Sequence, residues 1–209
     1  MYNRFIKRLI DLLLCIIALP FFLIILLFVA IAIKLDDGGS VFYKAERIGK
    51  DCKKIYMYKF RSMKENCENI LNPDGSTYNS KDDPRVTKVG KFLRATSIDE
   101  TPQILNVLKN EMSIIGPRAS GWTALENYQE DEMDKMKVKP GITGYTQANY
   151  RNSISVREKR LFDAWYANNV SLILDMKIFF KTITVVLLRK NLYTNENPEE
   201  SLNEIISTK

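Results

Sequence analysis

Two adjacent carboxylates, Asp99 and Glu100, lie in the segment TSIDETPQ and could take part in catalysis. The chain contains no histidine, so any acid, base or nucleophile must come from another residue type. A carboxylate can attack phosphorus to give an acyl phosphate, and Mg²⁺ can screen two neighbouring anions from each other. The pair is therefore compatible with phosphoryl-transfer chemistry, with Asp99 as the candidate nucleophile.

The same two carboxylates also fit an ordinary helix start. Ser97 and Glu100 have the spacing of a capping box, in which Ser97 is the N-cap. Pro102 lies too deep for that register, so Thr101 as N-cap with Pro102 opening the helix is the alternative. In either register a helix dipole would keep Asp99 ionised and attract a phosphate. From the pair alone, the capping interpretation is favoured over catalysis.

Basic residues gather in the segments around this pair. YKFRSM places Lys59 and Arg61 on one face of a strand, DPRVTKVGKFLR ends in Arg94, and Arg118 follows Pro117. The net charge of +6 indicates anionic partners. The sequence lacks a recognition helix or an aromatic-plus-basic surface, so nucleic acid fits poorly and a small phosphate-rich substrate fits better. The three cysteines show no CxxC spacing, and without histidine a cysteine–histidine zinc site is excluded.

These side chains follow a long apolar segment. Residues 12–33 are all apolar, counting Pro20, and at ~1.5 Å per residue they reach roughly 33 Å, about the hydrocarbon thickness of a bilayer. No small-residue cleavage site follows, which indicates a segment retained in the membrane. Basic residues flank both ends, so they favour neither orientation, and Pro20 favours a kink. A single span, slightly favoured, and a re-entrant hairpin both remain open. Lys7 and Asp11, four residues apart, can pair at the helix entry.

The remaining segments predict a mostly helical α+β domain with short strands. Two strand-like runs flank a turn at residues 49–51, and residues 66–83 form a polar loop. Helical patterns follow at residues 102–110, 124–138, 155–169 and 172–188. The last of these is too polar to span a membrane, so lying along the headgroups and packing into the core are equally open. The polar tail, residues 191–209, is expected to be loosely ordered.

The order of the motifs resembles a known family. KRLIDLLL precedes the apolar segment, and then come YKFRSM, DPRVTKVGKFLRATSIDETPQILNVLKNEMSIIGPR, KPGITGYTQANYR and FDAWYANNVSLILDMKIFFKTI. This order resembles the bacterial sugar transferases, the small monotopic phosphoglycosyl transferases, from about residue 4 to residue 190.

The resemblance implies a reaction and roles. A phosphosugar passes from a UDP-sugar to polyprenol (undecaprenyl) phosphate with release of UMP, which begins a surface polysaccharide or a glycoprotein glycan. Asp99 is then the nucleophile that forms a phosphosugar-aspartyl intermediate and lies near Mg²⁺, and Glu100 assists it. Lys59, Arg61, Arg94, Pro117, Arg118 and Arg151 are implied to bind the substrates.

The resemblance also implies an architecture. Residues 1–37 form a re-entrant membrane helix with its break at Pro20, and residues 38–190 form the catalytic domain with interfacial amphipathic helices. The protein is placed at the cytoplasmic face of the bacterial inner membrane, in contact with lipid and with other glycan pathway enzymes. This chain has Leu19-Pro20 where the family usually has Ser-Pro, and Ala119 where it has a second proline after Arg118. A membrane-anchored scaffold and a glycosyltransferase that releases UDP are the alternatives.

Overall fold

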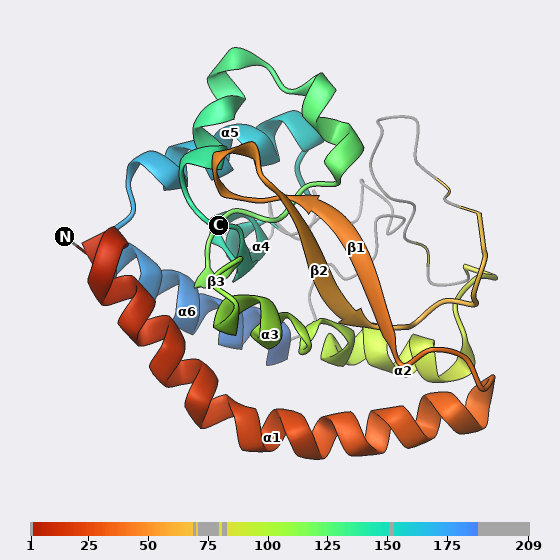
Figure 1. The fold of residues 1–209 in the computed structure, drawn as a ribbon. Coiled ribbons are helices and arrows are strands. Elements are labelled where there is room, and N and C mark those ends of the chain that lie inside the picture. Colours follow the sequence, from red (N-terminus) through yellow and green to blue (C-terminus); the bar gives the residue numbers. More distant parts are fainter. Residues whose placement is uncertain (1, 69, 71–79, 81–82, 151–152, 188–209) are drawn as a thin grey trace, which may run out of the picture.

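The computed structural model describes residues 2–68, 70, 80, 83–150 and 153–187 (Figure 1). Arg151 and the tail predicted for residues 191–209 lie outside the described residues. A long N-terminal helix runs along one side of a body built from two small sheets and several short helices. The predicted class, mostly helical α+β, is confirmed.

The apolar run forms one helix, α1 (Lys7–Asp36), after a single π-helical turn at Tyr2–Ile6. By length and composition α1 could cross a membrane. It continues through Pro20 and changes direction partway along (Figure 1). A proline lacks the N–H that the helix needs and presses on the preceding turn, which bends a helix without ending it. The break expected at Pro20 is therefore a bend within one continuous helix.

One stripe of α1 packs on the body and the rest is exposed. The buried side chains recur at helical spacing and so share one face, namely Lys7, Asp11, Cys15, Phe22, Val29 and Ile33. The other faces carry large apolar side chains that are more than half exposed, including Leu13, Ile17, Ile24, Phe28 and Leu35. An exposed apolar surface this large is typical of a segment that meets lipid.

The N-terminal end of α1 is tied to the body through two buried charges. The Lys7 ammonium donates to the carboxylate of Asp175, 168 residues away. The Asp11 carboxylate accepts from the hydroxyl of Ser113 at 2.8 Å and from the N–H of Ile114 at 3.0 Å. The predicted Lys7–Asp11 pair is therefore wrong, because each residue faces the body and finds a distant partner there.

The C-terminal end of α1 is tied to the same body. The Asp36 carboxylate accepts from the N–H of Val89 at 3.0 Å, and the Asp37 carboxylate accepts two hydrogen bonds from the guanidinium of Arg61. Paired carboxylate and guanidinium groups hold a fixed geometry. Both ends of the apolar helix therefore lie against one domain.

The two predicted strands form an antiparallel hairpin, β1 (Phe42–Ile48) and β2 (Lys54–Phe60). The turn between them carries Asp51 and Cys52 at positive φ, where a side chain is uncommon. At the other end Phe60 stacks on Phe42, with ring centroids 5.6 Å apart, and on Phe22 of α1 at 6.3 Å. The hairpin therefore packs directly on the apolar helix.

A second, parallel pair of strands joins β3 (Ser113–Ile115) to β4 (Gly141–Thr143). Glycines are required here because the backbones nearly touch. A Cβ on Gly141 would lie 2.1 Å from the backbone N of Gly116, and one on Gly144 would lie 2.0 Å from the Gly116 carbonyl oxygen. The remaining helices are α2 (Lys88–Thr96), α3 (Gln103–Leu108), α4 (Tyr145–Asn149), α5 (Val156–Asn168) and α6 (Leu172–Leu187).

The charged helix predicted over residues 124–138 is wrong, since this segment forms two 3₁₀ helices, Trp122–Asn127 and Glu130–Lys137. Some of its charged side chains are buried, although Glu130, Asp131 and Lys137 are exposed. The buried Glu132 pairs with Arg157 and Arg160 of α5, and Lys135 pairs with the buried Asp163 at 3.0 Å. Docking on α5 therefore sets the local conformation.

For α6, the last helix in the described part of the chain, packing into the core and lying along the membrane headgroups were both left open by the sequence. Asp175 and Ile178 are buried against the body. Another face exposes apolar side chains, namely Leu172, Ile173, Met176, Phe180 and Ile183. The helix therefore packs on the core and also presents an apolar surface outward.

Candidate active site

The two adjacent carboxylates lie on one turn of 3₁₀ helix, Ile98–Glu100, between α2 and α3. Ser97 has φ 58 and ends α2 through its N–H, which donates to the carbonyl of Arg94 at 3.2 Å. Its side chain caps nothing, and the hydroxyl of Thr101 donates back to the carbonyl of Ile98 at 2.9 Å. Both predicted capping interactions are therefore wrong, because Ser97 takes the left-handed conformation that ends α2 and no side chain caps the 3₁₀ turn or α3.

Glu100 is held by a lysine from the hairpin. The Lys59 Nζ lies 2.6 Å from Oε1 of Glu100, and both side chains are largely buried. Burial alone raises the pKa of the Glu100 carboxyl, but the positive charges of Lys59, Arg118 and Arg47 outweigh it and lower the pKa to about 2. Glu100 is therefore a permanent anion at neutral pH.

Asp99 is buried, with 9% of its surface exposed, and makes no side-chain hydrogen bond or ion pair with any described residue. Burial raises the pKa of its carboxyl to about 6, with a further contribution from Glu100. Lys59, Arg94 and Arg118 oppose the rise. With this pKa Asp99 is mostly ionised at neutral pH, and these cations favour its charged form.

Of the remaining predicted site residues, Arg94, Arg118 and Pro117 belong to the surroundings of the carboxylate pair, whereas Arg61 does not. Arg94 of α2 and Arg118, which is exposed, lie close enough to act on the charge of Asp99. Pro117 is fully buried, and its carbonyl accepts from the N–H of Gly141 at 2.9 Å. Pro117 therefore fixes the loop that carries Arg118.

Arg61 has a different set of partners. Its guanidinium holds Asp37, and it also donates to the carbonyls of Ser40 at 2.6 Å and Met63 at 3.1 Å. These contacts tie the end of β2 to the end of α1. The structure does not bring Arg61 to the carboxylate pair.

Arg47 of β1 belongs to the site and sequence reasoning missed it. Its Nε is buried and has no hydrogen-bond partner among the described residues. Burial lowers the pKa of Arg47, as does Arg118, and its charge also acts on Glu100. A buried donor without a partner, beside another cation, is suited to an incoming anion. A single arginine in AERIG gave no signal, because only the fold places it beside the pair.

Gln147 of α4 was also missed. Its side-chain oxygen is the other buried polar side-chain atom that has no partner in the described part of the chain. It lies near Gly144, whose own neighbour is the Gly116 carbonyl at the start of the Arg118 loop. A buried amide without a partner costs free energy unless a ligand satisfies it.

The carboxylate pair can be compared with the needs of Mg²⁺, the metal that the resemblance implied. Among the described residues, no group of three or more cysteine or acidic side chains is arranged so that it could hold a metal ion. Mg²⁺ is usually bound by one or two carboxylates together with substrate phosphates and water. Asp99 offers carboxylate oxygens that no cation among the described residues pairs with directly, whereas Glu100 is already held by Lys59. The donor set therefore fits a magnesium ion shared with a phosphorylated substrate.

Comparison with known proteins gives the family. The family described as bacterial sugar transferase matches residues 2–189. The chain is 39% identical to an uncharacterized sugar transferase of Haemophilus influenzae over 91% of its length and 39% identical to exopolysaccharide production protein ExoY of Rhizobium meliloti over 90%. It is 41% identical to UDP-glucose:undecaprenyl-phosphate glucose-1-phosphate transferase of Escherichia coli over 91%.

The relatives differ in length. The match covers 43% of the Haemophilus influenzae protein and 42% of the Escherichia coli protein, but 88% of the Rhizobium meliloti protein. The chain thus spans less than half of two of these curated relatives and most of the third.

Proposed function

This chain belongs to the bacterial sugar transferase family, and on that premise we propose that it is a phosphoglycosyl transferase. It moves a phosphosugar from a UDP-sugar to undecaprenyl phosphate and releases UMP. Relatives named as undecaprenyl-phosphate phosphotransferases for galactose and N-acetylgalactosamine, each 39% identical, support the acceptor and the reaction class. The observation that carries the proposal is the contrast between Asp99, which is buried and has no partner in the described part of the chain, and Glu100, which is held by Lys59.

The first step is attack by a carboxylate oxygen of Asp99 on the sugar-linked phosphorus of the donor. A bond forms between that oxygen and phosphorus, the bridging P–O bond of the diphosphate breaks, and UMP leaves with the bridging oxygen. A carboxylate with a raised pKa is more basic than an ordinary one, so it is a better nucleophile while it remains mostly ionised. Arg47, Arg94 and Arg118 supply positive charge for the diphosphate.

In the second step a phosphate oxygen of the polyprenol phosphate attacks the same phosphorus. The Asp99–phosphorus bond breaks, and the product is a polyprenyl diphosphate sugar. Glu100, with a pKa of about 2, does not take up a proton near neutral pH. We therefore assign it to positioning Lys59 and to charge balance. When bound, Mg²⁺ supplies charge neutralisation for the phosphates, and Asp99 is the residue that would hold it.

The membrane arrangement is part of this proposal. The donor is soluble and the acceptor is a lipid, so the site must lie at the membrane surface. Both ends of α1 contact one domain, at Asp11 and Asp37, which supports a helix that enters and leaves by the same face. The exposed apolar surfaces of α1 and α6 would lie in the lipid, with the domain at the cytoplasmic face.

The test is a single-turnover assay without acceptor. Purified protein is mixed with Mg²⁺ and each of UDP-glucose, UDP-galactose and UDP-N-acetylgalactosamine. With the cognate donor we expect about one equivalent of UMP and a protein mass increase equal to the phosphosugar. Asp99→Asn should give neither, and Glu111→Gln serves as the control for loss of a carboxylate elsewhere. UMP release at the normal rate by Asp99→Asn would exclude the covalent route, and UDP as the product would indicate an ordinary glycosyltransferase.

A further inference from the structure

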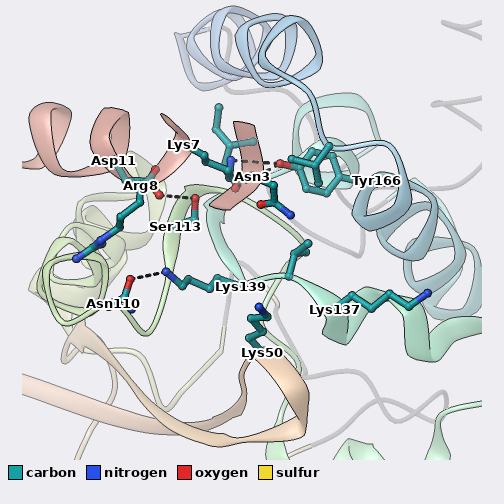
Figure 2. A pocket seen from close by; sticks show the side chains of 13 residues that line it. Asn3, Lys7, Arg8, Asp11, Lys50, Asn110, Ser113, Lys137, Lys139 and Tyr166 are labelled. Atoms are coloured by element: carbon teal, nitrogen blue, oxygen red, sulfur yellow. Dashed lines mark hydrogen bonds between the residues drawn. The ribbon is translucent and has the colours of Figure 1, made fainter. Parts of the chain in front are cut away.

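A cavity of about 480 Å³ lies beside the N-terminal end of α1 (Figure 2). Its wall includes none of the residues assigned to the active site. The lining side chains come from α1, from the turn of the β1–β2 hairpin and from the segment before β4, and they include Lys7, Arg8, Asp11, Lys50, Lys137 and Lys139. Five of these six are cations.

Two of the cations are neutralised by nearby acids. Lys7 pairs with the buried carboxylate of Asp175. Lys137 pairs with Asp134 at 2.7 Å, and its side chain points away from the cavity (Figure 2). The other three cations carry three positive charges and Asp11 carries one negative charge, so the wall has a net charge of about +2.

The three remaining cations have no acidic partner among the described residues. The Arg8 guanidinium donates to the carbonyl oxygens of Val107 at 2.6 Å and Leu108 at 3.1 Å. The Lys139 ammonium donates to the side-chain oxygen of Asn110 (Figure 2). Lys50 makes no side-chain hydrogen bond or ion pair within the described part of the chain, although its ammonium faces the cavity in Figure 2.

The electrostatics of Lys139 agree with this excess. Its pKa is lowered by burial first, and then by the like charges of Arg8, Lys50 and Lys7, which outweigh Asp11. A bound anion would relieve this repulsion. A phosphate group has the charge and the oxygen acceptors that several ammonium and guanidinium donors can share.

Exposed apolar side chains on the elements that border the cavity indicate which phosphate fits. Phe5 and Leu9 lie close in sequence to the lining residues Lys7 and Arg8, and they are 63% and 69% exposed. Ile173, which is 70% exposed, follows the lining residue Val170 by three positions. A charged cavity on segments that also expose apolar side chains matches a molecule that carries a phosphate on acyl chains.

We propose that this cavity binds the phosphate of an anionic phospholipid, with Lys50 and Lys139 as its main partners. The acyl chains then lie along the exposed apolar side chains of α1 and α6. The site would hold the N-terminal end of α1 at the level of the headgroups. The proposal rests on the proposed membrane arrangement but not on the transfer reaction.

The test uses the full chain in neutral detergent and measures thermal unfolding during a titration. Short-chain phosphatidylglycerol is the probe, and it is compared with glycerol phosphate, inorganic phosphate and a diacylglycerol of the same chain length. We expect a saturable rise in Tm with phosphatidylglycerol, a much weaker one with the two free phosphates, and none with diacylglycerol. Asp99→Asn should bind like the wild type, which separates this site from catalysis.

The decisive variant is Lys50→Gln with Lys139→Gln, matched by Lys53→Gln with Lys91→Gln, two exposed lysines that do not line the cavity. Loss of two phosphate partners should weaken the apparent Kd for phosphatidylglycerol by about tenfold or more, whereas the control pair should stay within about twofold. Lys50→Gln alone disturbs no contact of the described residues and should weaken binding by about threefold. Wild-type affinity in the double variant overturns the site. Equal binding of a free phosphate or of diacylglycerol overturns the assignment to a phospholipid.

Discussion

Asp99 and Glu100 are neighbours in the sequence, yet their carboxyl groups have pKa values on opposite sides of the ordinary range. Burial raises the pKa of Asp99 to about 6, whereas at Glu100 the effect of burial is overcome by Lys59 and the arginines, which lower the pKa to about 2. Environments that push two such groups apart are typical of sites where each has its own role. The roles proposed above, nucleophile for Asp99 and positioning residue for Glu100, rest on this difference.

The first prediction concerns pH. Protonated Asp99 cannot attack phosphorus, so kcat/KM for UMP release should fall below about pH 6, by about tenfold per pH unit. Lys59→Gln removes a charge that opposes the rise of the Asp99 pKa, so the acid limb should move to higher pH. Lys44→Gln, on the neighbouring strand, is the control. A profile in Lys59→Gln that overlays the wild-type profile after scaling would contradict the role of Lys59.

The second prediction concerns stability. The folded-state pKa of Asp99 lies above its ordinary value of 3.8, so the folded protein binds the proton more tightly than the unfolded chain. The contribution of Asp99 to stability therefore decreases as pH rises from about 4 to about 6 and stays low above that range. Asp99→Asn should raise the free energy of unfolding at pH 7.5 by up to roughly 3 kcal/mol. Chemical denaturation at pH 7.5 and at pH 4.5 measures this gain, which should shrink at the lower pH.

The third prediction concerns Arg47. Because its buried Nε has no partner among the described residues, Arg47→Gln should leave Tm unchanged or slightly higher. If Arg47 binds the donor diphosphate, the same change should raise KM for the UDP-sugar by about tenfold or more. Arg47→Lys keeps the charge but not the planar donor geometry, so it should recover only part of the loss. A lower Tm with unchanged KM would indicate a structural role instead.

The fourth prediction separates two roles for Arg61. Its contacts with Asp37 and two backbone carbonyls predict that Arg61→Gln lowers the free energy of unfolding by about 2 kcal/mol or more, because the charge-assisted hydrogen bonds of a buried guanidinium are lost. The KM of the fraction that stays folded should change little. A rise in KM with unaltered stability would restore the substrate-binding role suggested by the sequence.

The fifth prediction concerns the membrane arrangement. In a chain with Cys52 and Cys67 replaced by serine, Asn3→Cys and Lys44→Cys should both react with an impermeant maleimide in inverted membrane vesicles. Neither should react in intact spheroplasts. The remaining Cys15 is only 1% exposed and serves as the internal background. Reaction of Asn3→Cys from the outer side would establish a spanning helix.

Local sequence patterns predicted most helices and strands, whereas the surroundings of the candidate site residues depend on contacts between segments that are distant in the sequence. The β1–β2 hairpin and the helices α3, α5 and α6 follow from periodicity and turn residues that act over a few positions. The conformation of Ser97 could not be read in the same way, because Ser97 ends α2 in the left-handed region instead of capping a helix with its side chain. The charge of Arg47 acts on Glu100 only because the hairpin places it there, and nothing near Arg47 in the sequence indicates this.

The buried charges at the start of α1 have a consequence for the order in which the protein forms. Asp11 finds its partner 102 residues later, and Lys7 finds Asp175 168 residues later, in the last helix that the structure describes. During synthesis the apolar helix therefore emerges and can reach lipid long before these partners exist. The C-terminal end of α1 can be fastened once Arg61 and Val89 have emerged, whereas the Lys7–Asp175 pair at its N-terminal end must wait until α6 has left the ribosome. A ribosome that stalls before that point should leave an inserted helix whose N-terminal end still lacks the Lys7–Asp175 pair.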